Sequence, residues 1–494
     1  MPLTTHQSRS MRYFNFHIKI LTAALTGVML FTAACSFVPE YKRPAMPVAG
    51  TWPDQLPAYA AGQAAADLAF QDYFSSRILN QIIAMALENN RDLKVALLNI
   101  DQAKAAYQIK KSDELPVVSA STTVSREGIP EDDSSFGAPY TTDTAMEVGL
   151  GITSYELDFF GRIKSLSQSA LESYLATREA ASSTRIALVA QAADAYVNLL
   201  AQRKLHQLAR KTYKAQKATY NVIKTQYDEG ATDQLALAQA ATATQSAKTS
   251  IYQYKRLAAQ AENALVYLAG PGVYDLIRAP ATPFETIDDI GFLTQLPAGL
   301  PSGILLARPD IQAAEHELKA ANADIGAARA AMYPTISLTG SLGFAGQGLS
   351  YLFDPSRSLS WEFSPNVTIP IFNRKGLKAS LAAATAGEKI AAARYEGVIQ
   401  TAFREVADQL VARKYYKYEL DAQNALVSAS RDAYNLSKAR YDNGIDDFLT
   451  VLDSQRGLFS AEQGAIALKQ AYLSNLINLY KVMGGGKMDL SKAD

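Results

Sequence analysis

The single cysteine of the chain, Cys35, has the setting of a residue that is acylated after export. A lone thiol has no intramolecular disulfide partner, so it is either a buried or incidental thiol or a modified one. Residues 11–19 are basic, and residues 20–34 are apolar, too few to span a bilayer, and end in small side chains. We therefore interpret residues 1–34 as a lipoprotein signal peptide and predict a covalent N-acyl and diacylglycerol lipid at Cys35.

The other residues that could support catalysis or metal binding form no recognisable site. The four histidines (His6, His17, His206 and His316) are scattered, and none stands at metal-ligand spacing from a second ligand. The sequence has no glycine-rich phosphate loop and no nucleophile elbow. Lys and Arg number 48, as do Asp and Glu, so the basic excess typical of nucleic-acid binding is missing. We predict a protein that is not an enzyme, needs no metal or cofactor and binds no nucleic acid.

A long internal repeat organises the chain. The segment YNVIKTQYDEGATDQLAL from Tyr220 aligns with YNLSKARYDNGIDDFLTV from Tyr434, without a gap over about fifty residues. Each copy has the order helix, strand, strand, long helix, tight turn, long helix. We divide the chain into a signal peptide (1–34), an N-terminal extended segment (35–75), a first repeat (76–272), a linker (273–300), a second repeat (301–486) and a C-terminal tail (487–494).

Four segments alternate between apolar and small polar residues, which predicts strands at 117–126, 146–157, 335–345 and 361–371. A half-buried sheet on a soluble core would give the same alternation. The length of each segment and its small uncharged polar face instead favour tilted membrane strands. Four strands leave two open edges, and open edges cannot face lipid. A barrel therefore requires several copies of the chain, and the residues alone allow either two or three.

Two helical segments are far longer than those of a typical globular protein. Residues 162–227 and 374–441 contain no proline, and each ends in a turn with a glycine, Gly230 or Gly444. Asp233 can cap the helix after the first turn, and Asp446 or Asp447 the helix after the second. We therefore predict one long helical hairpin in each half of the chain. In the last helix a heptad-like seam includes Leu449, Leu452 and Arg456. A periplasmic coiled-coil scaffold would have similar helices.

Motifs spread over nearly the whole mature chain resemble TolC-type outer membrane factors. The chain is most similar to the OprM-like lipoprotein branch, which serves resistance-nodulation-division (RND) multidrug efflux pumps. The motifs are Val38-Pro-Glu-Tyr-Lys-Arg-Pro, Ala86-Leu-Glu-Asn-Asn-Arg-Asp-Leu, Tyr155-Glu-Leu-Asp-Phe-Phe-Gly-Arg, Leu300-Pro-Ser-Gly, Arg308-Pro-Asp-Ile, Ile325-Gly-Ala-Ala-Arg-Ala-Ala, Thr401-Ala-Phe-Arg-Glu-Val-Ala-Asp, Arg440-Tyr-Asp-Asn-Gly and Leu452-Asp-Ser-Gln-Arg.

This resemblance implies a mixed α+β membrane protein. Three subunits would form one transmembrane β-barrel of twelve strands, four from each, continuous with a long periplasmic α-helical barrel. The resemblance also implies lipid anchoring at Cys35 in the outer membrane, a periplasmic adaptor docked on the tips at Gly230 and Gly444, and an inner-membrane RND pump. The implied function is a passive, gated exit channel for drugs and other small toxic compounds. The alternatives are a periplasmic scaffold, or a channel for metal efflux or protein secretion.

The resemblance further implies a gate just after the second tip. The matching positions are Leu449, Asp453 and Arg456, and Tyr441 matches a position that ties neighbouring helices together. Three copies of Leu449 could form an apolar constriction, and three of Asp453 a carboxylate ring. A helix-dipole aspartate with a solvated ion pair is the simpler alternative.

The chain departs from the family pattern at its second tip. Asp446 stands where TolC has an arginine, and Ala236 stands opposite, so the TolC gate salt bridge does not carry over. Gln239 of the first repeat stands where the second has Asp453. The gate charge therefore belongs to one hairpin, and we expect asymmetric opening.

Overall fold

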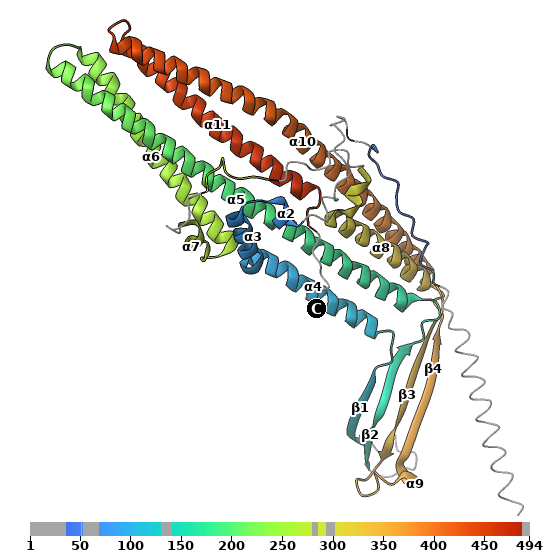
Figure 1. Cartoon of the computed structure of the whole chain (residues 1–494). Coiled ribbons are helices and arrows are strands. Elements are labelled where there is room, and N and C mark those ends of the chain that lie inside the picture. Colours follow the sequence, from blue (N-terminus) through green and yellow to red (C-terminus); the bar gives the residue numbers. More distant parts are fainter. Residues whose placement is uncertain are drawn as a thin grey trace, which may run out of the picture. The chain divides into compact units, whose positions relative to one another are not determined.

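The computed structural model describes residues 36–50, 52, 69–129, 141–278, 285–292 and 302–486. Within these ranges the chain forms long helices and one antiparallel sheet of four strands, which confirms the predicted mixed class (Figure 1). The signal peptide, Cys35 and the tail 487–494 lie outside the described residues, as does much of the linker. The chain divides into two compact units. One comprises residues 1–43, 102–175 and 316–393, and the other 44–101, 176–315 and 394–494.

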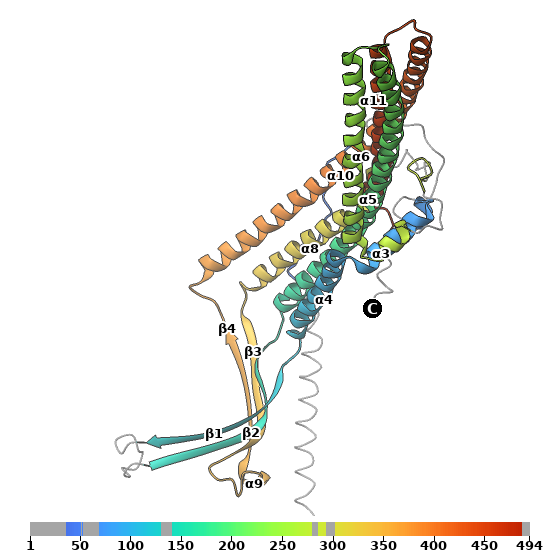
Figure 2. The same ribbon diagram turned by 90° about the vertical axis from the view of Figure 1, so that its left-hand side faces the viewer.

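The sheet belongs to the first unit and has the order β1-β2-β3-β4 (Figure 2). Its strands are β1 (Val118–Ile129), β2 (Thr141–Glu156), β3 (Thr335–Gly346) and β4 (Leu359–Thr368). Neighbouring strands are antiparallel, and β2 of the first repeat pairs with β3 of the second. Among the described strands, β1 and β4 each have a single partner, so the sheet has two open edges.

Several strand ends differ from the predicted ones. β2 begins at Thr141, five residues before the alternation predicts, and β1 continues to Ile129 in register with it. β4 ends at Thr368 rather than at residue 371. Pro370 has no backbone N–H to donate to a sheet ladder, which explains the early end. Gly149 and Gly343 face each other so closely that a Cβ on Gly343 would lie 2.6 Å from the Gly149 Cα atom.

Two helical hairpins account for most of the helical residues. α5 (Arg162–Asp228) turns into α6 (Gln234–Ala269), and α10 (Arg374–Asp442) turns into α11 (Phe448–Val482). Figure 1 shows each pair lying side by side near its turn. The remaining helices are α2 (Phe70–Tyr73), α3 (Arg77–Asn89), α4 (Arg91–Ser112), α7 (Val273–Arg278), η3 (Ser302–Ala307), α8 (Pro309–Ala330) and α9 (Pro355–Ser358). None of the described helices is both long and apolar enough to cross a membrane.

The two tips have the same backbone design. Gly230 and Gly444 adopt φ angles of 77° and 71°, a left-handed conformation that ends a helix and suits glycine. Asp233 accepts a hydrogen bond from the Ala236 N–H at 2.8 Å, and Asp447 accepts one from the Thr450 N–H at 3.0 Å. Asp447, and not Asp446, is therefore the cap of the second hairpin.

In the first unit, the segment 36–41 is held against α8 by stacked rings and hydrogen bonds. The Phe37 ring stacks on Tyr333 at a centroid distance of 4.7 Å, and Tyr333 stacks on Phe160 at 4.9 Å. Asn322 Nδ2 donates to the Pro39 carbonyl at 2.9 Å. Beside this contact, a Cβ on Gly326 would lie 2.9 Å from the Val38 Cα atom. The segment just after Cys35, which we name the N-terminal strap (residues 36–41), is thus seated closely on α8.

Candidate functional site

The three predicted gate residues lie on one face of α11, in the first turns after the second tip. Leu449, Asp453 and Arg456 are spaced four and three apart, which places their side chains in one row. Leu449 is 43% exposed although it is apolar, and the side chains of Asp453 and Arg456 are each 62% exposed. Arg456 Nη1 donates to Asp453 Oδ1 at 3.1 Å. An exposed apolar side chain is therefore followed by an exposed ion pair.

The opposite face of the same turns is buried in a tip cluster. Phe448, Val451 and Leu452 of α11 pack with Ile223 of α5 and Ala240 of α6. Burial of these side chains fixes the rotation of α11 about its axis, so the row of Leu449 faces away from the cluster. Within this chain the heptad-like seam is buried at Leu452, whereas Leu449 and Arg456 are exposed. The helix packs against several neighbours at once, and its buried face is wider and rotated relative to the seam.

A buried pair of amides continues the tip cluster, and the sequence did not predict it. Gln216 Nε2 on α5 donates to Gln455 Oε1 on α11 at 2.7 Å. Both residues are buried, and Gln216 Oε1 has no hydrogen-bond partner among the described residues. Gln455 lies one helical turn beyond Val451 and Leu452, a spacing that could have indicated its burial. The pair links the second hairpin to the first through a buried hydrogen bond.

Tyr441 also links the two hairpins. Its hydroxyl lies 3.2 Å from Gln226 Oε1 on α5 and donates to it. Its ring packs against Phe448 at a centroid distance of 5.7 Å. The hydrogen bond joins α10 to α5 of the same chain, and the role of Tyr441 in a gate stays a prediction.

The Asp446 carboxylate forms an ion pair within its own tip. Arg440 Nε and Nη2 donate to the two Asp446 carboxylate oxygens at 2.6 and 2.8 Å. The hydrogen bond from Arg440 lowers the pKa of Asp446, and the same contact raises the pKa of Arg440. The residue that replaces the TolC arginine therefore stabilises the turn of its own hairpin.

Gly230 and Gly444 are exposed at the ends of the hairpins. A Cβ built at either glycine meets no atom within 4 Å, so a larger side chain would fit there. The positive φ angle is the reason that glycine is favoured at both positions. Both tips are thus tight turns whose surface is exposed.

The histidines of the described region serve packing and hydrogen bonding. His316 Nδ1 lies 2.6 Å from Glu172 Oε2, and Gln168 donates to the other oxygen of that carboxylate at 2.8 Å. Burial lowers the pKa of His206. Among the described residues, no group of three or more His, Cys, Asp and Glu side chains could hold a metal ion. The tip of the second hairpin therefore remains the strongest candidate site.

Comparison with known proteins points to one family. The profile of the family described as outer membrane efflux protein matches residues 82–271 and 300–485, one stretch in each repeat. The antibiotic efflux pump outer membrane protein ArpC of Pseudomonas putida is 44% identical over 472 residues, covering 94% of this chain and 95% of ArpC. The toluene efflux pump outer membrane protein TtgC of the same species has the same identity and coverage.

A solved structure agrees with the fold over nearly the same span. The open state of the MtrE outer membrane channel of Neisseria gonorrhoeae superposes with a TM-score of 0.81 at 35% identity. The match covers 91% of this chain and 98% of MtrE.

Proposed function

The chain belongs to the outer membrane efflux protein family, and from this premise we propose that it forms the passive, gated exit channel of a tripartite efflux system. It is an outer-membrane component of an efflux pump. The relatives' names specify antibiotics and toluene, which supports drugs and other small toxic compounds as the exported class. Family membership does not favour a periplasmic scaffold.

The open sheet edges support a homotrimer. β1 and β4 lack an outer partner among the described strands, and Val118, Trp361 and Phe363 on them expose large apolar side chains. Unpaired backbone groups are costly in lipid, so the edges must pair with other copies. Three copies would close a barrel of about twelve strands, within the range of outer-membrane barrels. The helices of the three subunits would continue it as a periplasmic α-barrel.

The gate proposal rests on one observation: Leu449 is exposed while its neighbours Phe448, Val451 and Leu452 are buried. Around a three-fold axis, three Leu449 side chains would form an apolar constriction. Three Asp453 carboxylates would follow as a ring that attracts cations. The Asp453–Arg456 ion pair is exposed, so it contributes little stability and can exchange partners when the channel opens.

Energy for transport would come from an inner-membrane RND pump, since the relatives' names describe components of efflux pumps. A periplasmic adaptor would dock on the tips at Gly230 and Gly444. If its contacts differ between the closed and open states, docking shifts the equilibrium toward opening. The gate charge lies on one hairpin only, so the second hairpin would swing outward. The lipid on Cys35 would anchor the complex to the outer membrane.

Deletion and complementation test the function. Cells that lack the chain should become more susceptible to antibiotics and toluene, and the full-length chain should restore resistance. The outer-membrane fraction should contain a heat-modifiable trimer labelled by radioactive palmitate. Unchanged susceptibility, together with an unlabelled soluble monomer, would contradict the proposal.

A further inference from the structure

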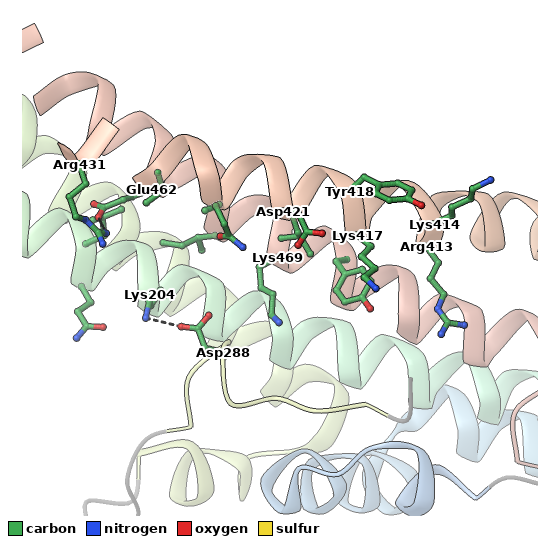
Figure 3. A pocket seen from close by; sticks show the side chains of 18 of the residues that line it. Lys204, Asp288, Arg413, Lys414, Lys417, Tyr418, Asp421, Arg431, Glu462 and Lys469 are labelled. Atoms are coloured by element: carbon green, nitrogen blue, oxygen red, sulfur yellow. Dashed lines mark hydrogen bonds and ion pairs between the residues drawn. The ribbon is translucent and has the colours of Figure 1, made fainter. Parts of the chain in front are cut away.

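A long groove lies within the second unit, away from the tip cluster. Its volume is about 1260 Å³, and its walls are α5, α10 and α11, with Asp288 at one edge (Figure 3). On α10 alone its lining runs from Leu410 to Arg431, which corresponds to roughly 30 Å of helix at 1.5 Å per residue. A groove of this length is larger than a small ion needs and matches an extended ligand.

The groove carries an excess of positive charge in a chain whose formal net charge is zero. Of the described side chains that line it, seven are lysine or arginine and three are aspartate or glutamate. Two of these carboxylates are already paired. Lys204 Nζ lies 3.0 Å from Asp288, and Arg431 Nη2 lies 2.8 Å from Glu462. Outside these two pairs, the lining has five basic side chains and one carboxylate, that of Asp421.

Three of the lysines are available for a ligand. Lys211, Lys417 and Lys469 form no ion pair with any residue in the described part of the chain. Figure 3 shows Lys417 and Lys469 extending into the same space from α10 and α11. Asp421 lies between them on α10, and its carboxylate offsets one of the positive charges. Neighbouring like charges without partners repel one another, so an anion in the groove would relieve this repulsion.

The groove also has an apolar lining. Leu410 and Ile466 are buried at its base, and Leu208, Leu420 and Val427 are half-buried along it. A ligand that covers these side chains must bring apolar groups as well as negative charge. This excludes a plain polyanion as the best fit, because such a ligand would leave the leucines in contact with water.

The positive charge that the groove offers comes from side chains and not from backbone N–H groups. The walls come from the interiors of three helices, where the backbone N–H groups are used within the helix, so no helix N-terminus points inward. The available cations are lysine ammonium groups, which act as point charges and lack the bidentate geometry of arginine. A groove with apolar side chains on three helices can receive the apolar face of a further helix.

We propose that this groove binds an acidic, amphipathic helical segment of a partner protein, about twenty residues long. Its glutamates and aspartates would contact Lys211, Lys417 and Lys469, and its apolar face would cover the leucines at the base. The proposal does not rest on the channel function, since it uses residues separate from the gate row and from both tips.

Binding of a synthetic peptide tests the proposal. The probe is a fluorescein-labelled peptide of about twenty residues with glutamate on one helical face and leucine on the other. It is titrated into the purified full-length protein in detergent and followed by fluorescence anisotropy. We expect saturable binding that weakens as salt is raised. The double variant Lys417→Glu, Lys469→Glu should weaken it by about tenfold or more. Asp421→Lys should strengthen it.

The control is Lys248→Glu, which repeats the charge change of one groove lysine at an exposed position on α6 outside the groove. It should alter the affinity by less than about twofold. Several outcomes would overturn the proposal: no binding to the wild-type protein, equal loss in the Lys248 variant, or equal affinity for a peptide with lysine in place of glutamate. Equal or tighter binding of poly-glutamate or polyphosphate would also overturn it, because neither has an apolar face. A heat-modifiable oligomer like that of the wild type shows that each variant is folded.

Discussion

The Tyr441 hydroxyl donates a hydrogen bond to Gln226 Oε1 at 3.2 Å, and so joins the tip of the second hairpin to the first hairpin. The two residues are 215 positions apart in the chain. Tyr441 lies near the end of α10, and the gate row begins across the tip at the start of α11. An outward swing of the second hairpin away from α5 would therefore break this bond. We therefore propose that the contact acts as a latch between the hairpin with the proposed gate charge and the hairpin without it.

Removing the latch should favour the open channel. Tyr441→Phe keeps the ring contact with Phe448 and deletes the hydrogen bond, which costs the closed state about 1 kcal/mol per subunit. This corresponds to roughly a fivefold shift toward the open state per subunit, seen as more frequent openings in single-channel recordings. Tyr434→Phe is the control, since Tyr434 packs on the same cluster. Equal opening frequencies in the two variants would contradict the latch.

The N-terminal strap should depend on the glycine beneath it. Gly326→Val introduces a Cβ that would lie 2.9 Å from the Val38 Cα atom, so the strap must move away at a cost of about 1–3 kcal/mol. Trypsin should then cleave faster after Lys42, as measured by mass spectrometry of the released N-terminal fragment. Gly387→Val is the control, because a Cβ there meets nothing within 4 Å. Identical cleavage rates in the two variants would show that the strap is not held at this point.

Asp194 should make stability depend on pH. Burial raises the pKa of this carboxyl above its unfolded value, although a hydrogen bond from Ser474 partly opposes the shift. The folded protein therefore holds the proton more tightly than the unfolded chain. This contribution to stability is complete below the unfolded pKa and is lost as pH rises through the folded pKa.

The variant Asp194→Asn should accordingly survive heating better than the wild type at neutral pH. The advantage should disappear below about pH 4, where the wild-type carboxyl is protonated in both states. Loss of the oligomer on a semi-native gel, measured after heating across this pH range, gives the comparison. Asp324→Asn changes an exposed aspartate and should have no such effect. A less stable Asp194 variant at neutral pH would refute the assignment.

The local parts of this fold could be predicted from the sequence because they depend on short-range periodicity. Alternation of apolar residues predicts the strands, and the absence of proline predicts the long helices. Glycines that take positive φ angles, such as Gly230 and Gly444, mark the ends of those helices. Asp233 is spaced as a helix cap and forms the expected hydrogen bond. The resemblance between the two repeats supplied the order of these elements.

The long-range parts could not be predicted, because they depend on which helix faces pack. The heptad spacing placed Leu449 on the packed side of α11, whereas contacts with α5 and α6 bury Phe448 and Val451 instead. The Gln216–Gln455 pair joins residues far apart in sequence and gives no local signal. The Arg440–Asp446 pair spans a turn whose geometry determines whether the two side chains meet.

Single-channel recording in planar bilayers tests the central claim most directly. Leu449→Ala should raise the conductance by widening an apolar constriction, and Asp453→Ala should reduce the preference for cations over anions by removing a carboxylate ring. Gln239→Ala, at the corresponding position of the first repeat, should match the wild type. If conductance and ion selectivity are unchanged in both the Leu449 and the Asp453 variants, the second hairpin does not carry the gate.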